Sequence, residues 1–386
     1  MNQYGITDNS ISIYIHWPFC LSKCPYCSFN SYQINDILNF EHWKLAYFFS
    51  LNKMAESTDS RIVRSIYFGG GTPSLLPTWF IEAILLKIQS LWTIDSNVEV
   101  SIEINPTTAT SVYMNNLKTV GINRVSIGVQ SFSDTGLTVL GRTHTVKDSI
   151  NTISLCAKFF PNHSLDLIYA WPSHTPESWR SELQMAVSFG TPHLSLYQLM
   201  IEDNSVFGSM YTRGELLVPD ENVCVDMFET AQRITEQAKL PAYEVSNHAC
   251  LGFECIHNII YWIYKDYIGV GPGAHSHITI NQKKYAIVQE SNPRKWLKII
   301  LNNQFIPSTS ECLSEKEQAR EAILVGLRTV QGVDCNALPT SLASVINNDA
   351  YTHLVQRKFL IYKKGVLKAT YKGRKRLNAM LTYLLK

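Results

Sequence analysis

The feature that most constrains the fold of this chain is a regular alternation of short β-prone runs with longer segments of helical periodicity. The β-prone runs cover residues 12–16, 65–68, 98–104, 124–129, 164–168 and 194–199. Alternation of this kind is typical of a parallel sheet whose strands are joined by crossover helices. The runs are nearly continuous in apolar residues, as expected for strands covered on both faces, and segments such as Thr78–Leu91 repeat apolar residues at helical intervals. Six such units predict an α/β fold built as a partial (β/α)6 barrel.

Polar and glycine residues follow these runs at the points where the strands are expected to end. They are three clustered cysteines, the triple glycine Gly69 to Gly71, Glu103, Gln130 and Asp166. The functional residues of barrels gather at the carboxyl ends of the strands. We therefore expect these residues to face one site.

A different pattern begins after the polar stretch 302–314. The tail is rich in helical segments and ends in two β-prone runs divided by Lys363, Lys364 and Gly365, which predicts a hairpin before a last helix. This order predicts a small α+β domain of winged-helix type. Winged helices often bind DNA, and the tail is basic at Lys363, Lys364, Lys368, Lys372, Arg374, Lys375 and Arg376. A solvated charged face on a packing domain is the more common outcome.

Composition narrows the class of protein. The formal net charge is +2 over 386 residues, so no strong basic field argues for a nucleic-acid partner. The first ten residues lack the pattern of a secretory signal, and no stretch reaches the roughly 20 apolar residues of a membrane span. Nine cysteines, an odd number, favour thiolate chemistry over a disulfide framework. These observations predict a soluble, cytoplasmic protein.

The three clustered cysteines carry the clearest chemistry. Cys20, Cys24 and Cys27 form CxxxCxxC directly after a predicted strand, and Pro18 and Pro25 keep the loop from becoming helical. Three thiolates can hold three irons of a [4Fe-4S] cluster, which leaves the fourth iron open for a substrate. Two alternatives remain: a zinc site completed by His16, and three buried thiols without a ligand.

The segment YIHWPFCLSKCPYCSF, including Tyr26 before the third cysteine, closely resembles the signature of the radical S-adenosylmethionine (SAM) superfamily. The resemblance implies a cluster on Cys20, Cys24 and Cys27, with SAM chelating the open iron and cleaved by one electron to a 5′-deoxyadenosyl radical. It implies that GGGTP contacts the SAM amino group. The residues that bind SAM by this resemblance are Tyr14, Tyr26, Gly70, Gly71, Thr72, Glu103, Gln130, Arg142 and Asp166. The alternative is an internal pair of arginine and carboxylate without a ligand.

Further segments narrow the resemblance to the branch that contains oxygen-independent coproporphyrinogen III oxidase: GINRVSIGVQSF, HLSLYQL, YEVSNHA and YIGVGPGAHS. Phe29 stands where the oxidase type has a further cysteine, and 19 residues precede Cys20, whereas the oxidase type has a long extension there. The segment HNIIYW resembles a motif of the heme chaperone family HemW within this branch. It implies heme binding by His257, Asn258, Tyr261 and Trp262.

The chemistry of that motif is plausible from its residues, because imidazole is a good axial ligand and aromatic rings offer flat faces to a porphyrin. His257 as a satisfied core residue and Cys255 as the heme ligand remain alternatives, and no role is assigned to Cys250. By resemblance, residues 1–200 form the radical SAM core, 201–305 complete the barrel and carry the heme motif, and 306–386 form the HemN-type C-terminal domain.

The resemblance implies a heme chaperone that uses the cluster and SAM and delivers heme to acceptor proteins, among them respiratory enzymes. It also implies an electron donor and is compatible with peripheral contact to a membrane; a nucleic-acid partner is not expected. Three competing readings stay open. They are a coproporphyrinogen III oxidase-like enzyme that decarboxylates a propionate, a radical methyltransferase with a second SAM, and a DNA-associated regulator that uses the basic tail.

Overall fold

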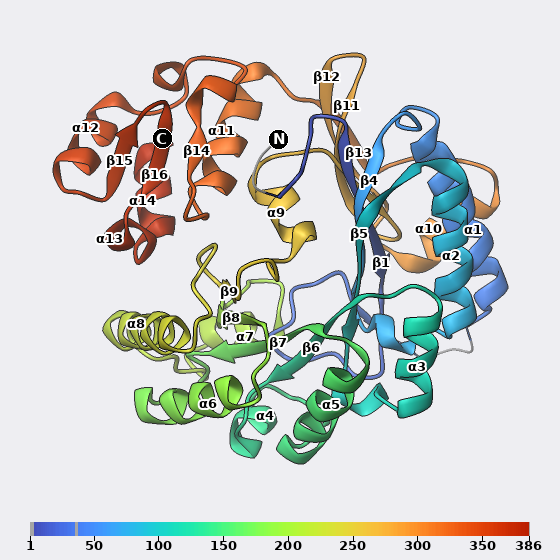
Figure 1. Ribbon diagram of the computed structural model, residues 1–386, viewed down its shortest axis with the longest axis horizontal. Helices are drawn as coiled ribbons and strands as arrows, with labels where there is room; N and C mark the ends of the chain where they lie inside the picture. Colours follow the sequence, from blue (N-terminus) through green and yellow to red (C-terminus); the bar gives the residue numbers. More distant parts are fainter. Residues whose placement is uncertain (1–3, 35–37, 386) are drawn as a thin grey trace.

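A single large sheet organises the computed structural model, which describes residues 4–34 and 38–385 (Figure 1). It has eleven strands in the order β13-β12-β11-β10-β1-β4-β5-β6-β7-β8-β9. The six predicted strands are all present and run parallel to one another. They are β1 Ser10–Trp17, β4 Ile62–Gly70, β5 Thr93–Ile104, β6 Arg124–Gln130, β7 Asn162–Tyr169 and β8 His193–Gln198. Since β13 and β9 are the two ends of the strand order, the barrel is open, as predicted.

Helices cross over between the parallel strands and cover the outer face of the sheet (Figure 1). Their starts are encoded locally: Thr145 and Asp148 form a capping box at the start of α5, and the Asp220 side chain accepts from two backbone N–H groups at the start of α8. The helices of this region are α1 Phe40–Ala55, α2 Thr78–Leu91, α3 Ser111–Thr119, α4 Asp134–Val139, α5 Val146–Phe159, α6 Pro176–Ser188, α7 Val206–Thr212 and α8 Glu221–Gln237.

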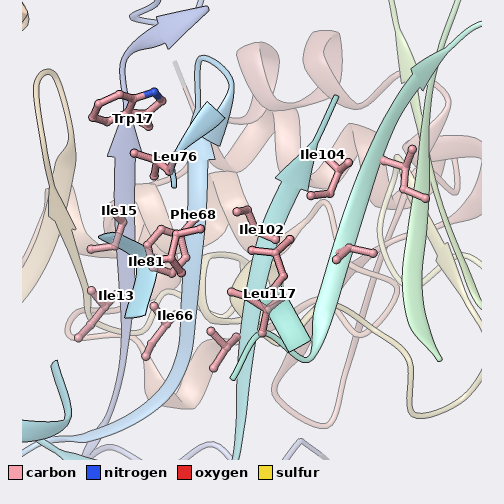
Figure 2. Packing of buried hydrophobic residues seen from close by; sticks show 14 of the residues in the cluster. Ile13, Ile15, Trp17, Ile66, Phe68, Leu76, Ile81, Ile102, Ile104 and Leu117 are labelled. Carbon is pink, nitrogen blue, oxygen red and sulfur yellow. The ribbon is translucent and has the colours of Figure 1, made fainter. Parts of the chain in front are cut away.

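The apolar core lies between the sheet and these helices, and it uses only one face of each strand. Figure 2 shows Ile13, Ile15, Ile66, Phe68, Ile102 and Ile104 packed with residues such as Ile81 of α2 and Leu117 of α3. The alternate positions of the same strands carry serine, tyrosine, arginine and carboxylate side chains. The expected near-continuous apolar character therefore holds for the helix-facing side alone, because the other side lines the polar interior of the barrel.

Four strands beyond β1 extend the sheet in a way that the sequence did not predict. β10 Tyr267–Val270 pairs in parallel with β1, and β11 His275–Ile280, β12 Lys283–Val288 and β13 Thr309–Cys312 continue antiparallel. The polar stretch 302–314 thus contains an edge strand instead of only a linker. Its polarity is physically reasonable, since exposed edge strands are short and polar in soluble proteins. β9 Asn247–Ala249 closes the opposite edge, antiparallel to β8.

The C-terminal elements form a second apolar cluster with a three-stranded sheet ordered β14-β16-β15. The predicted hairpin is confirmed: β15 and β16 pair antiparallel around Lys364 and Gly365, which both have positive φ. The predicted domain boundaries after residues 200 and 305 stay predictions. The remaining elements are α9 Ile256–Trp262, α10 Pro293–Leu301, α11 Glu315–Gly326, β14 Val333–Asp334, α12 Asn348–Gln356, β15 Leu360–Lys363, β16 Val366–Ala369, α13 Tyr371–Arg374 and α14 Leu377–Leu384.

Some basic residues of the C-terminal tail contact other residues of the chain. The ammonium of Lys375 pairs with the Glu229 carboxylate of α8, and Lys372 lies over the ring of Phe359. These contacts use positive charges of the tail for packing against neighbouring elements. Among the described helices, none combines the length and apolar character that crossing a membrane requires.

Candidate functional site

One cavity of about 600 Å³ occupies the interior of the open barrel. It brings together all twelve residues that the sequence assigned to the cluster and to SAM, although they span positions 14 to 166. These residues are Tyr14, Cys20, Cys24, Tyr26, Cys27, Gly70, Gly71, Thr72, Glu103, Gln130, Arg142 and Asp166. One detail differs from expectation: Asp166 lies within β7, three residues before its end. Arg142 comes from the loop after α4.

The cysteine loop begins on the short strand β2 Phe19–Cys20, which pairs with β3 Tyr32–Gln33. Cys20 is buried, Cys24 and Cys27 are half-buried, and all three thiols are free. Burial raises the pKa of Cys20 above its usual value. The guanidinium of Arg142 contacts the sulfur of Cys24, with 3.4 Å between Nη1 and Sγ. A cation placed there suits a group of thiolates.

The three thiols of the cysteine loop line the cavity, but they are not arranged as the ligands of one metal ion. Within residues 4–34 and 38–385, no three His, Cys, Asp or Glu side chains are grouped as the ligands of a single metal ion. The ring of His16 is engaged on both nitrogens: Nδ1 lies 3.1 Å from the Tyr14 hydroxyl, and Nε2 lies 2.9 Å from the carbonyl oxygen of Asn30. This geometry argues against His16 as the fourth ligand of a zinc ion. It fits thiols that hold a larger cluster facing the cavity.

The glycine run brings bare backbone to the wall of the cavity. Gly70 has a φ of 114°, and a Cβ atom there would lie 2.7 Å from the His16 ring and from the carbonyl oxygen of Trp17. A Cβ on Gly71 would lie 2.7 Å from the carbonyl oxygen of Phe19. Only glycine fits at both positions, because β1 and β2 approach this backbone so closely. The N–H groups are already used: that of Gly71 donates to the carbonyl oxygen of Trp17 at 2.6 Å, and that of Gly70 donates to Glu103. Contact of this segment with the SAM amino group, which the resemblance implies, stays a prediction.

Two half-buried carboxyl groups, Glu103 and Asp166, face the cavity. Burial, and then the neighbouring Asp166, raise the pKa of Glu103 to about 8, against hydrogen bonds from the Tyr67 hydroxyl and the Gly70 N–H. Burial also raises the pKa of Asp166, although hydroxyl groups donate to it, including that of Ser126 at 2.8 and 3.0 Å. Neither carboxyl has an opposite charge in salt-bridge contact among the described residues. The pair is therefore suited to receive a cationic ligand.

Sequence reasoning missed part of the cavity wall. Tyr67, Arg124, Ser126, Ser195 and Tyr197 also line it. The signal was present, because polar residues alternate with apolar ones along β4, β6 and β8, in the stretches SIYFGG, RVSIGVQ and HLSLYQ. Reading these strands with period 2 would have assigned the polar positions to the interior face.

The HNIIYW segment forms helix α9, and its residues divide between two faces of that helix. His257, Asn258 and Tyr261 line the cavity, whereas Trp262 does not. The Trp262 ring lies 4.8 Å from the guanidinium of Arg328, just after α11. Arg328 in turn reaches the buried carboxylate of Glu244, with 3.4 Å between Nη2 and Oε2. The motif therefore joins the cavity to the C-terminal elements.

His257 is held firmly in the cavity wall. Its side chain is 3% exposed, and its Nδ1 lies 2.6 Å from the Ser12 hydroxyl oxygen and 3.2 Å from that of Ser65. Burial, and then the charge of Arg124, lower the pKa of His257 to about 3, so the imidazole is neutral. Glu99 of β5 fixes the start of α9 by accepting from the backbone N–H groups of residues 256 and 257, each at 3.1 Å.

The neighbouring cysteines are placed away from the cavity lining. Cys255 is buried against Glu99, with 3.5 Å between Sγ and Oε1, and burial raises its pKa to about 12. It does not line the cavity, and neither does Cys250. Ligation of a bound group by Cys255 would need a rearrangement of the start of α9.

Comparisons with known proteins agree with this geometry. The Radical SAM superfamily model matches residues 14–186. The heme chaperone HemW of Synechocystis is 36% identical over 335 residues, covering 85% of this chain and 80% of that protein. HemW of Buchnera aphidicola is 32% identical over 378 residues, covering 97% and 98%. The structure of coproporphyrinogen III oxidase (HemN) from Escherichia coli matches with a TM-score of 0.81 at 17% identity, covering 97% of this chain and 89% of that one.

Proposed function

This chain belongs to the radical SAM superfamily, in the HemW family of relatives, and from that premise we propose that it binds heme and transfers it to acceptor proteins. One observation carries the proposal: a single cavity is lined by the three thiols, by the predicted SAM-binding residues and by three residues of HNIIYW. The radical SAM family implies a [4Fe-4S] cluster and SAM; the three free thiols fit the cluster, and the carboxyl groups of Glu103 and Asp166 fit the cationic groups of SAM.

We assign the cluster to Cys20, Cys24 and Cys27. The bound cluster would supply one-electron chemistry to SAM at its open iron. The residues of the chain then have separate tasks. Gly70 and Gly71 let β4 and the turn after it pack closely against β1 and β2 at the wall of the cavity. Glu103 and Asp166 lie where an ammonium or sulfonium group would favour their ionised forms. Arg142 stays beside the sulfur of Cys24 and offsets the negative charge of the thiolates.

For heme we keep His257, Asn258 and Tyr261 as candidates at the inner wall of the cavity. The hydrogen bonds of the His257 ring to described residues all use Nδ1, so Nε2 is the nitrogen that would serve as a ligand. Trp262 has a different task in this proposal, since its stacking on Arg328 connects α9 to the C-terminal elements. The proposal also includes an electron donor and acceptor proteins, among them respiratory enzymes. It further includes a cytoplasmic location and peripheral contact with a membrane.

The test is a heme titration of the anaerobically reconstituted protein with SAM present, followed by the heme absorption band. Saturable binding of one heme per chain, with transfer to an apoprotein acceptor and no turnover of coproporphyrinogen III, is the expected result. Absence of saturable binding would overturn the chaperone function. Consumption of coproporphyrinogen III with release of carbon dioxide would replace the chaperone function with an oxidase activity. The fold shared with coproporphyrinogen III oxidase is compatible with that activity.

A further inference from the structure

Three exposed apolar side chains surround the mouth of the barrel cavity. Leu21, Phe29 and Met200 are 59%, 65% and 60% exposed, and all three line the cavity. Leu21 and Phe29 belong to the cysteine loop, whereas Met200 follows β8. Single exposed apolar residues are ordinary on protein surfaces, but three at one cavity mouth form a surface that a ligand can cover. We name these three residues the rim.

The rim stands on an ordered base. The backbone N–H of Phe207 donates to the carbonyl oxygen of Pro25 at 2.9 Å, which ties α7 to the cysteine loop. Tyr26 of that loop packs against the apolar cluster that contains Leu199 and Phe207. The two segments that present the rim are thus fixed to each other beneath it. The apolar side chains of the rim remain outside this packing, open to solvent.

The cavity changes character with depth. Its inner wall is polar and carries Glu103 and Asp166, which lack a cationic partner in salt-bridge contact among the described residues. Such a wall suits a small cationic ligand. The rim suits a flat apolar ligand, because covering exposed apolar surface is favourable in proportion to its area. The same cavity therefore offers two chemically distinct positions.

The charges at the mouth indicate which flat ligand fits. Lys23 also lines the mouth, is exposed, and makes no salt bridge to a described residue. Glu202 is the acidic residue of this part of the lining and is half-buried. Heme combines an apolar macrocycle with carboxylates at one edge, so it can cover the rim and place one carboxylate at Lys23.

We propose that heme docks across the cavity mouth, on Leu21, Phe29 and Met200 with a propionate at Lys23, and leaves the inner wall to SAM. The proposal rests on the proposed function, since it names where that cargo first binds. His257 belongs to the inner wall and is 3% exposed, so it is not the ligand of heme docked at the mouth and stays a candidate only for heme that has moved further into the cavity.

The experiment compares heme affinity in the reconstituted, SAM-loaded protein. The double variant Phe29→Ser/Met200→Ser makes two already exposed positions polar, and the matched control is Leu86→Ser/Val112→Ser on α2 and α3, whose side chains are 58% and 72% exposed away from the cavity. We expect the heme dissociation constant to rise about tenfold or more in the rim variant and to change less than about twofold in the control. Lys23→Glu should weaken binding as well, and this effect should shrink at high salt. Iron and sulfide content reports whether each variant keeps its folded cluster loop.

The outcomes separate this proposal from the function on which it rests. If the wild-type protein binds no heme, the chaperone function itself fails. If the rim variant binds heme like the wild type while His257→Ala loses it, heme occupies the inner wall and the rim proposal is wrong. The proposal is equally overturned if the rim variant binds heme normally but no longer transfers it, since the rim would then be a surface for the acceptor protein.

Discussion

The rings of His257 and Tyr67 stack on each other, with centroids 4.6 Å apart and planes inclined by 21°. The Tyr67 hydroxyl donates to Glu103 at 3.2 Å. His257, the first residue of HNIIYW, thus contacts Tyr67, which is hydrogen-bonded to Glu103, a predicted SAM-binding residue. The HNIIYW motif, which the resemblance connects with heme, therefore lies next to the predicted SAM-binding residues of the cavity.

The first prediction concerns proton release when SAM binds. Because burial and Asp166 raise the pKa of Glu103 to about 8, this carboxyl is mainly protonated at pH 7. A cationic ligand favours the ionised form, so binding should release its proton. We expect calorimetry in buffers of different ionisation enthalpy to show up to about one more proton released by the wild type than by Glu103→Gln. Equal proton release from the two proteins would contradict a protonated Glu103 that ionises when SAM binds.

The second prediction concerns the cluster ligands. Cys20→Ala should lose most of its iron and sulfide after reconstitution while its circular dichroism stays native, because the removed thiol faces the cavity and not the apolar core between sheet and helices. Cys312→Ala is the matched control, since Cys312 is an exposed thiol on the edge strand β13. A full cluster in Cys20→Ala would exclude this assignment of ligands.

The third prediction concerns the contact between Arg328 and Glu244. Glu244 is 0% exposed and accepts from the Asn247 side chain at 2.6 Å. Removing the cation in Arg328→Ala would leave a buried carboxylate unpaired, so we expect a loss of about 2 to 3 kcal/mol in the free energy of unfolding. Arg328→Lys should recover only part of it, because lysine lacks the planar group that stacks on Trp262.

Urea unfolding measures this difference, and Arg213→Ala serves as the control. Arg213 forms a fully solvated pair with Glu215, so its removal should change stability little. If both variants were equally stable, the contact of Arg328 with Glu244 would be incidental.

The fourth prediction concerns acid stability. Burial, and then Arg374, lower the pKa of His248 to about 3, and its Nδ1 lies 2.9 Å from the Thr235 hydroxyl oxygen. Between about pH 6.5 and 3 the unfolded chain binds a proton at this residue that the folded chain does not, so stability falls as the pH falls through this window. His248 should account for about 2 kcal/mol of the stability lost at pH 5 relative to pH 7.

His248→Gln removes that titration. The variant should therefore lose less stability than the wild type between pH 7 and pH 5, as measured by urea unfolding at both values. Comparing the two proteins cancels the contribution of the other buried histidines to the loss of stability. His257 and His193 are examples, because burial lowers their pKa values as well. An identical loss in both proteins would contradict a neutral, buried His248.

The sequence alone determined the order of the six parallel strands, the helices between them, the cysteine loop and the C-terminal hairpin. These features depend on local chemistry: β-prone runs, helix caps such as Thr145, the spacing of Cys20, Cys24 and Cys27, and a turn at Lys364 and Gly365. The family resemblance added which strand-end residues share one ligand, and the structure brings those residues to one cavity. Their roles in binding remain predictions.

Only the tertiary structure decided how distant residues act on one another. Glu99 anchors α9, and this turns His257 and Tyr261 to the cavity and Trp262 to Arg328. The raised pKa of Glu103 requires both its burial and its nearness to Asp166, which lies on a different strand. The rim likewise forms from two segments about 170 positions apart. Side-chain environments of this kind depend on which elements meet, and the free energies of burial and pairing arise only once they have met.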